Sequence, residues 1–249
     1  ILIAAASAEG ETVILNAARE PEIADLADFL CSCGAHISGA DSGEITVCGV
    51  KKLHSAEHTV IPDRIIASTY MAAAAVTGGD VRILDTRAEH ITPVIPVFEQ
   101  AGCKVDCGEN SVHILAPVRL RSVQTVRTMP YPGFPTDSQA AVMAMLSVAH
   151  GTSVMIENIF ENRYRHVREL CRLGADIMTE GKVAVIKGVE TLTGACVCAA
   201  DLRAGTALAV AGLAAQGSTT IENVSLIDRG WQDMEEKLRS LGAEIERES

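Results

Sequence analysis

The chain is poor in aromatic residues and in positive charge. Its 249 residues include 1 Trp, 3 Tyr and 4 Phe, and 32 Asp and Glu against 21 Lys and Arg leave a formal net charge of −11. Nucleic-acid-binding proteins need cationic surfaces and stacking side chains, so this composition disfavours that class. No apolar run approaches the length of a membrane span. The remaining composition, 48% apolar and 21% charged, is typical of a globular protein.

Signatures of metal, disulfide and nucleotide-phosphate sites are also missing. Four of the eight cysteines form two closely spaced pairs, Cys31 and Cys33 and Cys196 and Cys198. One residue separates the members of each pair, which does not match the spacing of a zinc knuckle. His54 and His58 lie in a segment that does not look helical, and no GxxxxGK or GxGxxG segment occurs. We therefore expect buried free thiols in a reducing compartment, the cytoplasm, with no metal and no cofactor.

What the sequence does contain is an internal repeat. A first glycine closes an Ala-rich segment and is followed by a β-branched stretch, a short polar residue and an amphipathic stretch that stops at a second glycine. The two glycines are 24, 23, 23 and 25 residues apart. Glycine directly after a helix is typical of a C-terminal cap with positive φ. The four pairs are Gly10 and Gly34, Gly79 and Gly102, Gly151 and Gly174, and Gly217 and Gly242.

The repeat predicts an α/β fold of helix, strand, helix, strand, strand units. Strands are expected at 45–50, 112–117, 183–189 and 244–247, with a loop before each Ala-rich helix. Residues 1–9 align with the second half of such a helix, so we expect the sequence to be part of a longer protein. These units can bury their helices only against one another.

Asp63, Asp137 and Asp201 stand at the predicted starts of the Ala-rich helices. Aspartate caps free N–H groups there, so we favour capping as the shared role of all three. Asp137 differs because it follows Pro130-Tyr-Pro-Gly-Phe-Pro-Thr, whose three prolines make a stiff loop. Rigid loops at helix starts suit positioned functional groups, so Asp137 is also a candidate for chemistry.

Arginines recur at equivalent places. Arg163 and Arg229 follow strand-end asparagines, and Arg64 and Arg203 follow the aspartates. In an acidic chain such a gathering is typical of a small polyanion site. Ordinary surface ion pairs explain the pattern equally well, and both interpretations stay open.

Six segments together resemble motifs of the UDP-N-acetylglucosamine 1-carboxyvinyltransferases, the enolpyruvyl transferases of peptidoglycan synthesis, more than those of their relatives in the shikimate pathway. In order along the chain, the segments are Asn16–Ile23, Pro62–Ile65, Pro130–Asp137, Phe160–Arg163, Asp201–Ala204 and Ile227–Gly230.

The resemblance implies an inside-out α/β barrel of two similar domains, of which this chain covers the C-terminal part. Residues 1–60 would be the last repeat of the first, catalytic domain, and residues 61–249 the second domain. The implied reaction, EC 2.5.1.7, transfers enolpyruvyl from phosphoenolpyruvate to the 3-hydroxyl of UDP-N-acetylglucosamine and releases phosphate. A Lys-Asn pair and a loop cysteine of the family would precede residue 1, so we expect no turnover from the 249 residues alone.

The resemblance also implies roles for named residues. Asp137 would bind the sugar hydroxyl and act as general base, and Arg229 would be the main phosphoenolpyruvate contact. Substrate binding would further involve Ile159, Arg163, Asp201 and Arg203. Structural roles would fall to Glu20, Glu22, Asp63 and Arg64. The implied partners are the two small-molecule substrates, with no nucleic acid and no membrane.

Three positions depart from the family pattern. Leu226 stands where His is usual, Ile66 where Glu is usual, and Ser138 where Met is common. Leu226 and Ile66 leave an alternative open, a non-catalytic repeat protein that binds a small anionic ligand or a partner.

Overall fold

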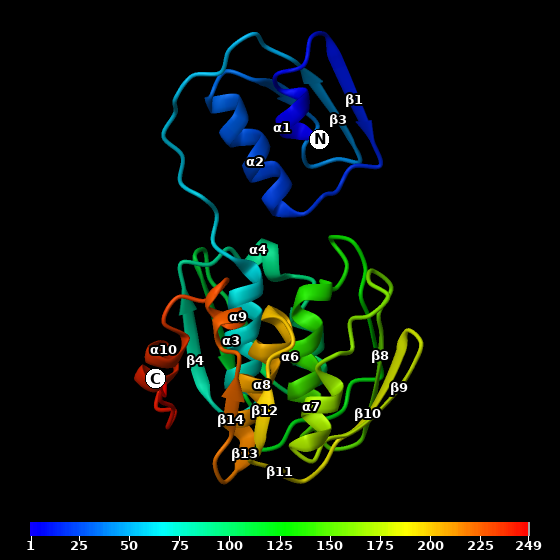
Figure 1. Cartoon of the computed structure of the whole chain (residues 1–249), viewed down its shortest axis with the longest axis vertical. Helices are drawn as coiled ribbons and strands as arrows, with labels where there is room; N and C mark the ends of the chain where they lie inside the picture. The colour runs from blue at the N-terminus through cyan, green and yellow to red at the C-terminus, as the bar shows by residue number, and fades with distance from the viewer. Residues whose placement is uncertain (249) are drawn as a thin grey trace. The chain divides into compact units, whose positions relative to one another are not determined.

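A computed structural model describes residues 1–248, which form two compact units (Figure 1). Unit 1 contains Ile1–Pro62 together with the turn Pro130–Gly133. Unit 2 contains Asp63–Met129 and the residues from Phe134 onward. Each unit has its own cluster of buried apolar side chains. The predicted division into family domains at residues 1–60 and 61–249 stays a prediction.

Unit 1 is one copy of the predicted repeat. Its sheet has the order β1-β3-β2 with antiparallel pairs, and Ile45 and Val47 of β3 are buried beneath the helices. Its elements are α1 (Leu2–Ala5), β1 (Glu11–Leu15), α2 (Pro21–Ser32), β2 (His36–Ser38) and β3 (Glu44–Cys48).

Unit 2 repeats this order with additions. Its elements are α3 (Arg64–Val76), β4 (Asp80–Leu84), α4 (Ala88–Ile91), α5 (Ile95–Gln100), β5 (Lys104–Cys107), β6 (Ser111–Leu115), β7 (Thr125–Arg127), α6 (Thr136–Leu146), β8 (Thr152–Ile156), α7 (Val167–Arg172), β9 (Asp176–Glu180), β10 (Val183–Lys187), β11 (Leu192–Thr193), β12 (Cys196–Cys198), α8 (Leu202–Ala214), β13 (Ala215–Gln216), β14 (Thr220–Glu222), α9 (Ser225–Asp228) and α10 (Met234–Ser240).

The helices α3, α6 and α8 pack side by side in the middle of unit 2 (Figure 1). Their sequences are apolar and small on nearly every side, which is typical of a helix that is buried all round. Nine of the eleven residues of α6 are buried, for example. The alternating burial of the surrounding strands, such as β6 and β10, shows that each sheet turns one face to these helices and the other to solvent.

The repeated topology is confirmed in three sheets. In each of these three repeats, the last strand lies between the other two and pairs with both in antiparallel orientation. The strand orders are β1-β3-β2, β4-β6-β5 and β8-β10-β9. The predicted C-terminal cap is confirmed for the second glycine of every pair, which has a φ that other residues rarely adopt. The values are +99° at Gly34, +99° at Gly102, +91° at Gly174 and +100° at Gly242. The cap prediction was wrong for Gly79, because the positive φ at the end of that helix, +67°, belongs to Gly78.

Other predictions about local structure were wrong. The segments before α6 and α8 are not simple loops, because β7 pairs in parallel with β8, β11 with β13, and β12 with β14. These strands have only two or three residues, too few for a pattern of alternation to be visible in the sequence. Residues 244–247 form no strand, since the described chain supplies no neighbouring strand for them there.

The expectation of buried thiols holds for only part of the set. All eight cysteines are free, and five of them are exposed. Cys33 and Cys103, which adjoin the capping glycines, are buried. Cys31 and Cys196 are exposed because each lies on the outward side of its helix or strand. Every helix within residues 1–248 is too short or too polar to span a bilayer.

Candidate active site

The start of α6 carries Asp137, whose role differs from that of the other two aspartates. Asp63 caps α3, since its Oδ1 accepts the N–H groups of Ile65 at 2.7 Å and Ile66 at 3.0 Å. Asp201 caps α8 through the N–H of Ala204 at 2.8 Å.

Asp137 makes no capping hydrogen bond within residues 1–248. The capping position of α6 is occupied by Pro135, and Asp137 is the second residue inside the helix. The prediction of a shared capping role is therefore wrong for Asp137, because the stiff proline loop starts the helix two residues earlier relative to the aspartate. Its carboxylate is left to make other contacts.

Two arginines hold that carboxylate. Nη2 of Arg163 lies 2.5 Å from Oδ1 of Asp137, and Nη2 of Arg203 lies 2.8 Å from Oδ2. Arg163 follows β8, and Arg203 lies in the first turn of α8, so residues distant in sequence converge on the start of α6. All three side chains are partly buried, and the Arg163 guanidinium lies 5.2 Å above the Phe160 ring.

These contacts decide the charge of Asp137. Burial alone would raise the pKa of its carboxyl, but Arg203 and then Arg163 outweigh burial and bring the pKa below its ordinary value. Asp137 is consequently an ionised hydrogen-bond acceptor at neutral pH and, while both arginines bind it, a weak proton acceptor.

His166 is a buried neighbour of Arg163, one of the two arginines that pair with Asp137. It is 2% exposed, and burial lowers its pKa to about 4, although Asp201 acts in the opposite direction. The ring is therefore neutral at pH 7. Its Nε2 atom is buried and has no hydrogen-bond partner among residues 1–248, and the ring also interacts with the backbone of Arg163.

Arg229 lies on a neighbouring turn. It is the exposed residue at the C-terminal cap of α9. A Cβ added at Gly230 would lie 2.8 Å from the Leu202 side chain, so the turn packs closely on the first turn of α8, next to Arg203. Within the described chain, however, Arg229 makes no ion pair with Asp137. Asp137, Arg163 and Arg203, which the resemblance assigns to the substrate site together with Arg229, are thus in direct contact with one another through Asp137.

Ile159 is exposed and lies between β8 and Arg163 in the sequence. Its N–H donates to Oε1 of Glu157 at 2.8 Å. Glu157 was missed in the sequence, where only its neighbour Asn158 stood out. The available signal was a glutamate directly after an apolar strand, but that pattern also fits an exposed residue. The side chain is in fact 1% exposed.

The residues predicted to be structural lie in both units. Glu20 precedes α2 and its Oε1 accepts the N–H of Tyr131 at 3.3 Å, both within unit 1. Glu22 lies exposed in the first turn of α2, and Arg64 is the buried first residue of α3. Ser138, which stands where the family commonly has Met, makes a buried hydrogen bond instead. Its hydroxyl lies 2.7 Å from that of Ser68, where α3 packs against α6.

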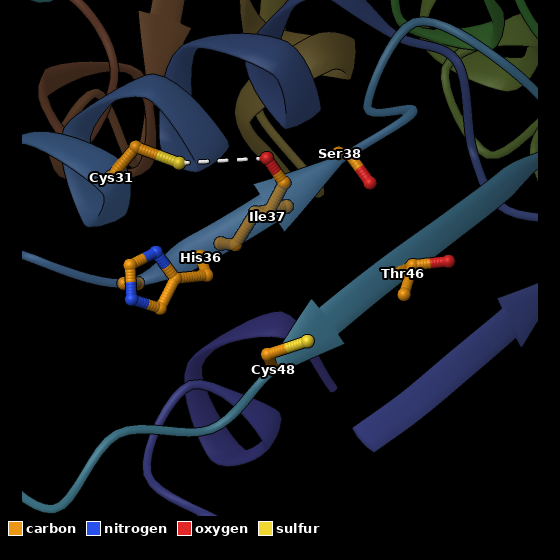
Figure 2. A pocket seen from close by; sticks show the side chains of 7 residues that line it. Cys31, His36, Ile37, Ser38, Thr46 and Cys48 are labelled. Carbon is orange, nitrogen blue, oxygen red and sulfur yellow. Dashed lines mark hydrogen bonds between the residues drawn. The ribbon is translucent and has the colours of Figure 1, made fainter. Parts of the chain in front are cut away.

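A hollow of about 310 Å³ lies elsewhere, on unit 1 (Figure 2). Cys31, His36 and Cys48 border it, and the Cys31 thiol donates to the carbonyl of Ile37 at 3.7 Å. None of the predicted site residues lines this hollow.

Sequence comparison places the chain among known proteins. Residues 1–238 match the family model of EPSP synthase (3-phosphoshikimate 1-carboxyvinyltransferase). The chain is 49% identical over 247 residues to UDP-N-acetylglucosamine 1-carboxyvinyltransferase 2 of Caldanaerobacter subterraneus, and 50% identical over 247 residues to UDP-N-acetylglucosamine 1-carboxyvinyltransferase of Geotalea daltonii. Each match covers 99% of this chain, and the chain spans 59% of the length of these relatives.

Solved structures agree. The enolpyruvyl transferase NikO from Streptomyces tendae superposes with a TM-score of 0.89 at 28% identity, over 98% of this chain and 58% of that one. EPSP synthase from Acinetobacter baumannii shares the fold, with a TM-score of 0.76 at 22% identity over 99% of this chain and 60% of that one. The resemblance read from six sequence segments is confirmed: the chain belongs to the EPSP synthase family, with a mixed α/β fold, and is a homologue of the UDP-N-acetylglucosamine 1-carboxyvinyltransferases.

Proposed function

We propose that this chain carries part of the active site of an enolpyruvyl transferase that acts on phosphoenolpyruvate and UDP-N-acetylglucosamine. The observation that carries the proposal is the Asp137 carboxylate held between Arg163 and Arg203. The identity of about half to carboxyvinyltransferases of that sugar nucleotide supports the choice of acceptor. The reaction would serve peptidoglycan and cell-wall synthesis in the cytoplasm.

The proposed architecture is the inside-out α/β barrel of the family. The central helices α3, α6 and α8 with sheets outside them support it. Residues 1–60 would belong to the first family domain and residues 61–249 to the second.

In the proposed reaction, the oxygen of the sugar 3-hydroxyl bonds to C2 of phosphoenolpyruvate while C3 takes up a proton. The hydroxyl proton needs an acceptor, for which Asp137 is proposed. Transfer of a proton from C3 to a base and cleavage of the bond between C2 and the phosphate oxygen then release phosphate and restore the double bond. Arg163, Arg203 and Arg229 would bind the carboxylate and phosphate of the donor, and Asp201 and Ile159 would contact the substrates.

The low proton affinity of Asp137 is consistent with this role if the arginines change partners. A donor with several negative charges competes with Asp137 for the two guanidinium groups. Each guanidinium that leaves removes one of the contacts that lower the pKa of Asp137, whereas burial continues to raise it. Binding of the donor would thereby turn Asp137 into a better base.

Calorimetric titration of the chain with phosphoenolpyruvate tests the anion site. We expect binding by the parent chain and roughly tenfold or more weaker binding by Arg203→Ala, because a charge-assisted hydrogen bond contributes about 1.5–3 kcal/mol. Arg172→Ala is the matched control, since Arg172 is exposed and pairs with Glu169 in α7. Equal weakening by both variants would contradict a local site.

A chimera tests the chemistry. The 247 aligned residues of this chain would replace the matching segment of the Caldanaerobacter relative, to which the chain is 49% identical. We expect phosphate release that requires both substrates, and a loss of about 10²–10⁴ in rate for Asp137→Asn. A folded chimera that binds phosphoenolpyruvate without turnover would favour the non-catalytic alternative.

A further inference from the structure

The buried carboxylate of Glu157 has no ion-pair partner among the described residues. It lies directly after β8 and is 1% exposed. Acidic side chains are almost never this buried unless their oxygens are fully occupied. The hydrogen bonds of the Glu157 carboxylate therefore indicate its role.

Four donors surround the two oxygens. Oε1 accepts the hydroxyl of Thr128 at 2.8 Å and the N–H groups of Ile159 at 2.8 Å and Phe160 at 3.1 Å. Oε2 accepts the hydroxyl of Thr136 at 3.0 Å. One carboxylate thus connects the residue after β7, the turn after β8 and the first residue of α6.

Two of these connections lead to the ion pair. Thr136 immediately precedes Asp137, and its carbonyl accepts Nη2 of Arg163 at 3.4 Å. The turn at Ile159 and Phe160 leads to Arg163, whose guanidinium lies over the Phe160 ring. Glu157 is consequently bonded to both of the chain segments whose side chains meet at Asp137.

We propose that Glu157 is a positioning residue that holds the start of α6 and the turn before Arg163 at the separation at which Arg163 and Asp137 pair. It acts through Thr136 and two backbone N–H groups and takes no part in the chemistry. Its consequence for catalysis rests on the proposed function, whereas its effect on the Asp137–Arg163 pair does not.

The pH titration of the Asp137 carboxyl carbon, followed by NMR in the full chain, tests this directly. In the parent chain the pKa is expected below the ordinary value, because both arginines are in place. In Thr136→Val and Glu157→Ala the pair loosens, and the pKa should rise by about one unit, the lower end of the effect of an adjacent arginine.

The sign separates positioning from charge. Removing the Glu157 charge in Glu157→Ala would by itself lower the pKa of Asp137, so a rise can come only from a loosened ion pair. Glu157→Gln should keep the pKa low, because the amide oxygen accepts the same three donors and the amide nitrogen can donate to the Thr136 hydroxyl.

Ser153→Ala is the matched control for lost stability. Ser153 is equally buried in β8 and accepts the N–H of Val123 at 3.0 Å, away from α6. It should lower the unfolding midpoint as Thr136→Val does, without moving the pKa of Asp137. If Glu157→Ala does not fold, Thr136→Val carries the test, and an unchanged or lowered pKa in that variant overturns the inference.

Phosphoenolpyruvate titration of the same proteins separates the two proposals. Weak or absent binding by the parent chain together with a raised pKa in Thr136→Val would contradict the proposed function and leave the positioning role supported. Binding by the parent chain together with an unchanged pKa of Asp137 in Thr136→Val would support the proposed function and contradict the positioning role of Glu157.

Discussion

At the residue scale, the chain uses one residue type in two ways at equivalent helix starts. Asp63 and Asp201 accept backbone N–H groups, whereas Asp137 accepts two guanidinium groups. The difference comes from where each helix begins relative to its aspartate. A carboxylate that directly precedes the first turn accepts the free N–H groups of that turn. A carboxylate inside the first turn is available to side chains from other elements.

Asp137→Asn should therefore tighten anion binding by the chain while it abolishes most turnover of the chimera. The amide keeps the shape of the side chain but no longer neutralises Arg163 and Arg203, so phosphoenolpyruvate meets less competition. We expect about tenfold tighter binding by calorimetry, equivalent to about 1.4 kcal/mol. Asp63→Asn is the control, because asparagine caps a helix equally well. Weaker binding by Asp137→Asn would mean that the carboxylate helps to hold the anion.

His166 should make the free energy of unfolding depend on pH between about 6.5 and 4. Its pKa is lowered to about 4 in the folded chain, so above pH 6.5 the ring is neutral in both states. As the pH falls through this window, only the unfolded state takes up a proton, and stability is lost. A difference of this size corresponds to roughly 3 kcal/mol.

His166→Phe should flatten this dependence even if it lowers the overall stability. Urea unfolding at several pH values measures the effect. The contribution of Asp137 has the same sign but belongs below its ordinary pKa of 3.8, so the two can be separated. An equally steep decline in His166→Phe would show that another group is responsible.

At the element scale, the close packing of α8 against α9 matters most for the site. α8 begins beside the turn that carries Arg229 and contributes Arg203 to the ion pair. A Cβ added at Gly205 would lie 2.5 Å from Cγ1 of Ile227 and 3.1 Å from Cβ of Ala199. The missing side chain at Gly205 is thus what lets the Arg229 turn approach α8.

Gly205→Ala should destabilise the chain by about 1–3 kcal/mol, the usual cost of overpacking. Gly212→Ala in the same helix is the matched control, because its added Cβ would meet Thr219 at an ordinary 3.4 Å. There the higher helix propensity of alanine should add about 0.5–1 kcal/mol of stability. Chemical denaturation measures both, and stabilisation by both substitutions would show that the α8–α9 contact relaxes without cost.

At the scale of the whole molecule, the two units have cores of very different size. The core of unit 1 contains few fully buried side chains, whereas that of unit 2 extends over α3, α6, α8 and the sheets around them. Smaller cores bury a smaller share of the surface exposed on unfolding and are less stable. The groups proposed to bind the anion, Arg163, Arg203 and Arg229, all belong to unit 2.

We therefore expect unit 1 to unfold at lower urea than unit 2. Trp231, the single Trp of the chain, lies buried in unit 2, so its fluorescence should change after the first loss of circular dichroism. Phosphoenolpyruvate should shift the fluorescence transition to higher urea and leave the earlier one in place, because it stabilises the state that binds it. Coincident transitions by both probes would contradict independent unfolding.

Much of the fold could be predicted from the sequence because its signals are local. The glycine caps, the Ala-rich helices and the strands around Ile45, Val112 and Val183 follow from backbone preference and from hydrophobic pattern over a few residues. The repeat carried these signals several times over, and the family motifs located Asp137, Arg163 and Arg203 as candidates. The short parallel strands β7, β11 and β12 left no such signal.

The tertiary structure alone decided which candidates touch. Asp137 could equally have capped its helix, and only the position of Pro135 together with the convergence of β8 and α8 brought two guanidinium groups to it. Burial likewise made Glu157 an internal connector and His166 a neutral ring, although both residue types are commonly exposed. The sequence determines local conformation through short-range preferences, whereas proton affinity and contact depend on desolvation and on neighbours brought together from distant segments.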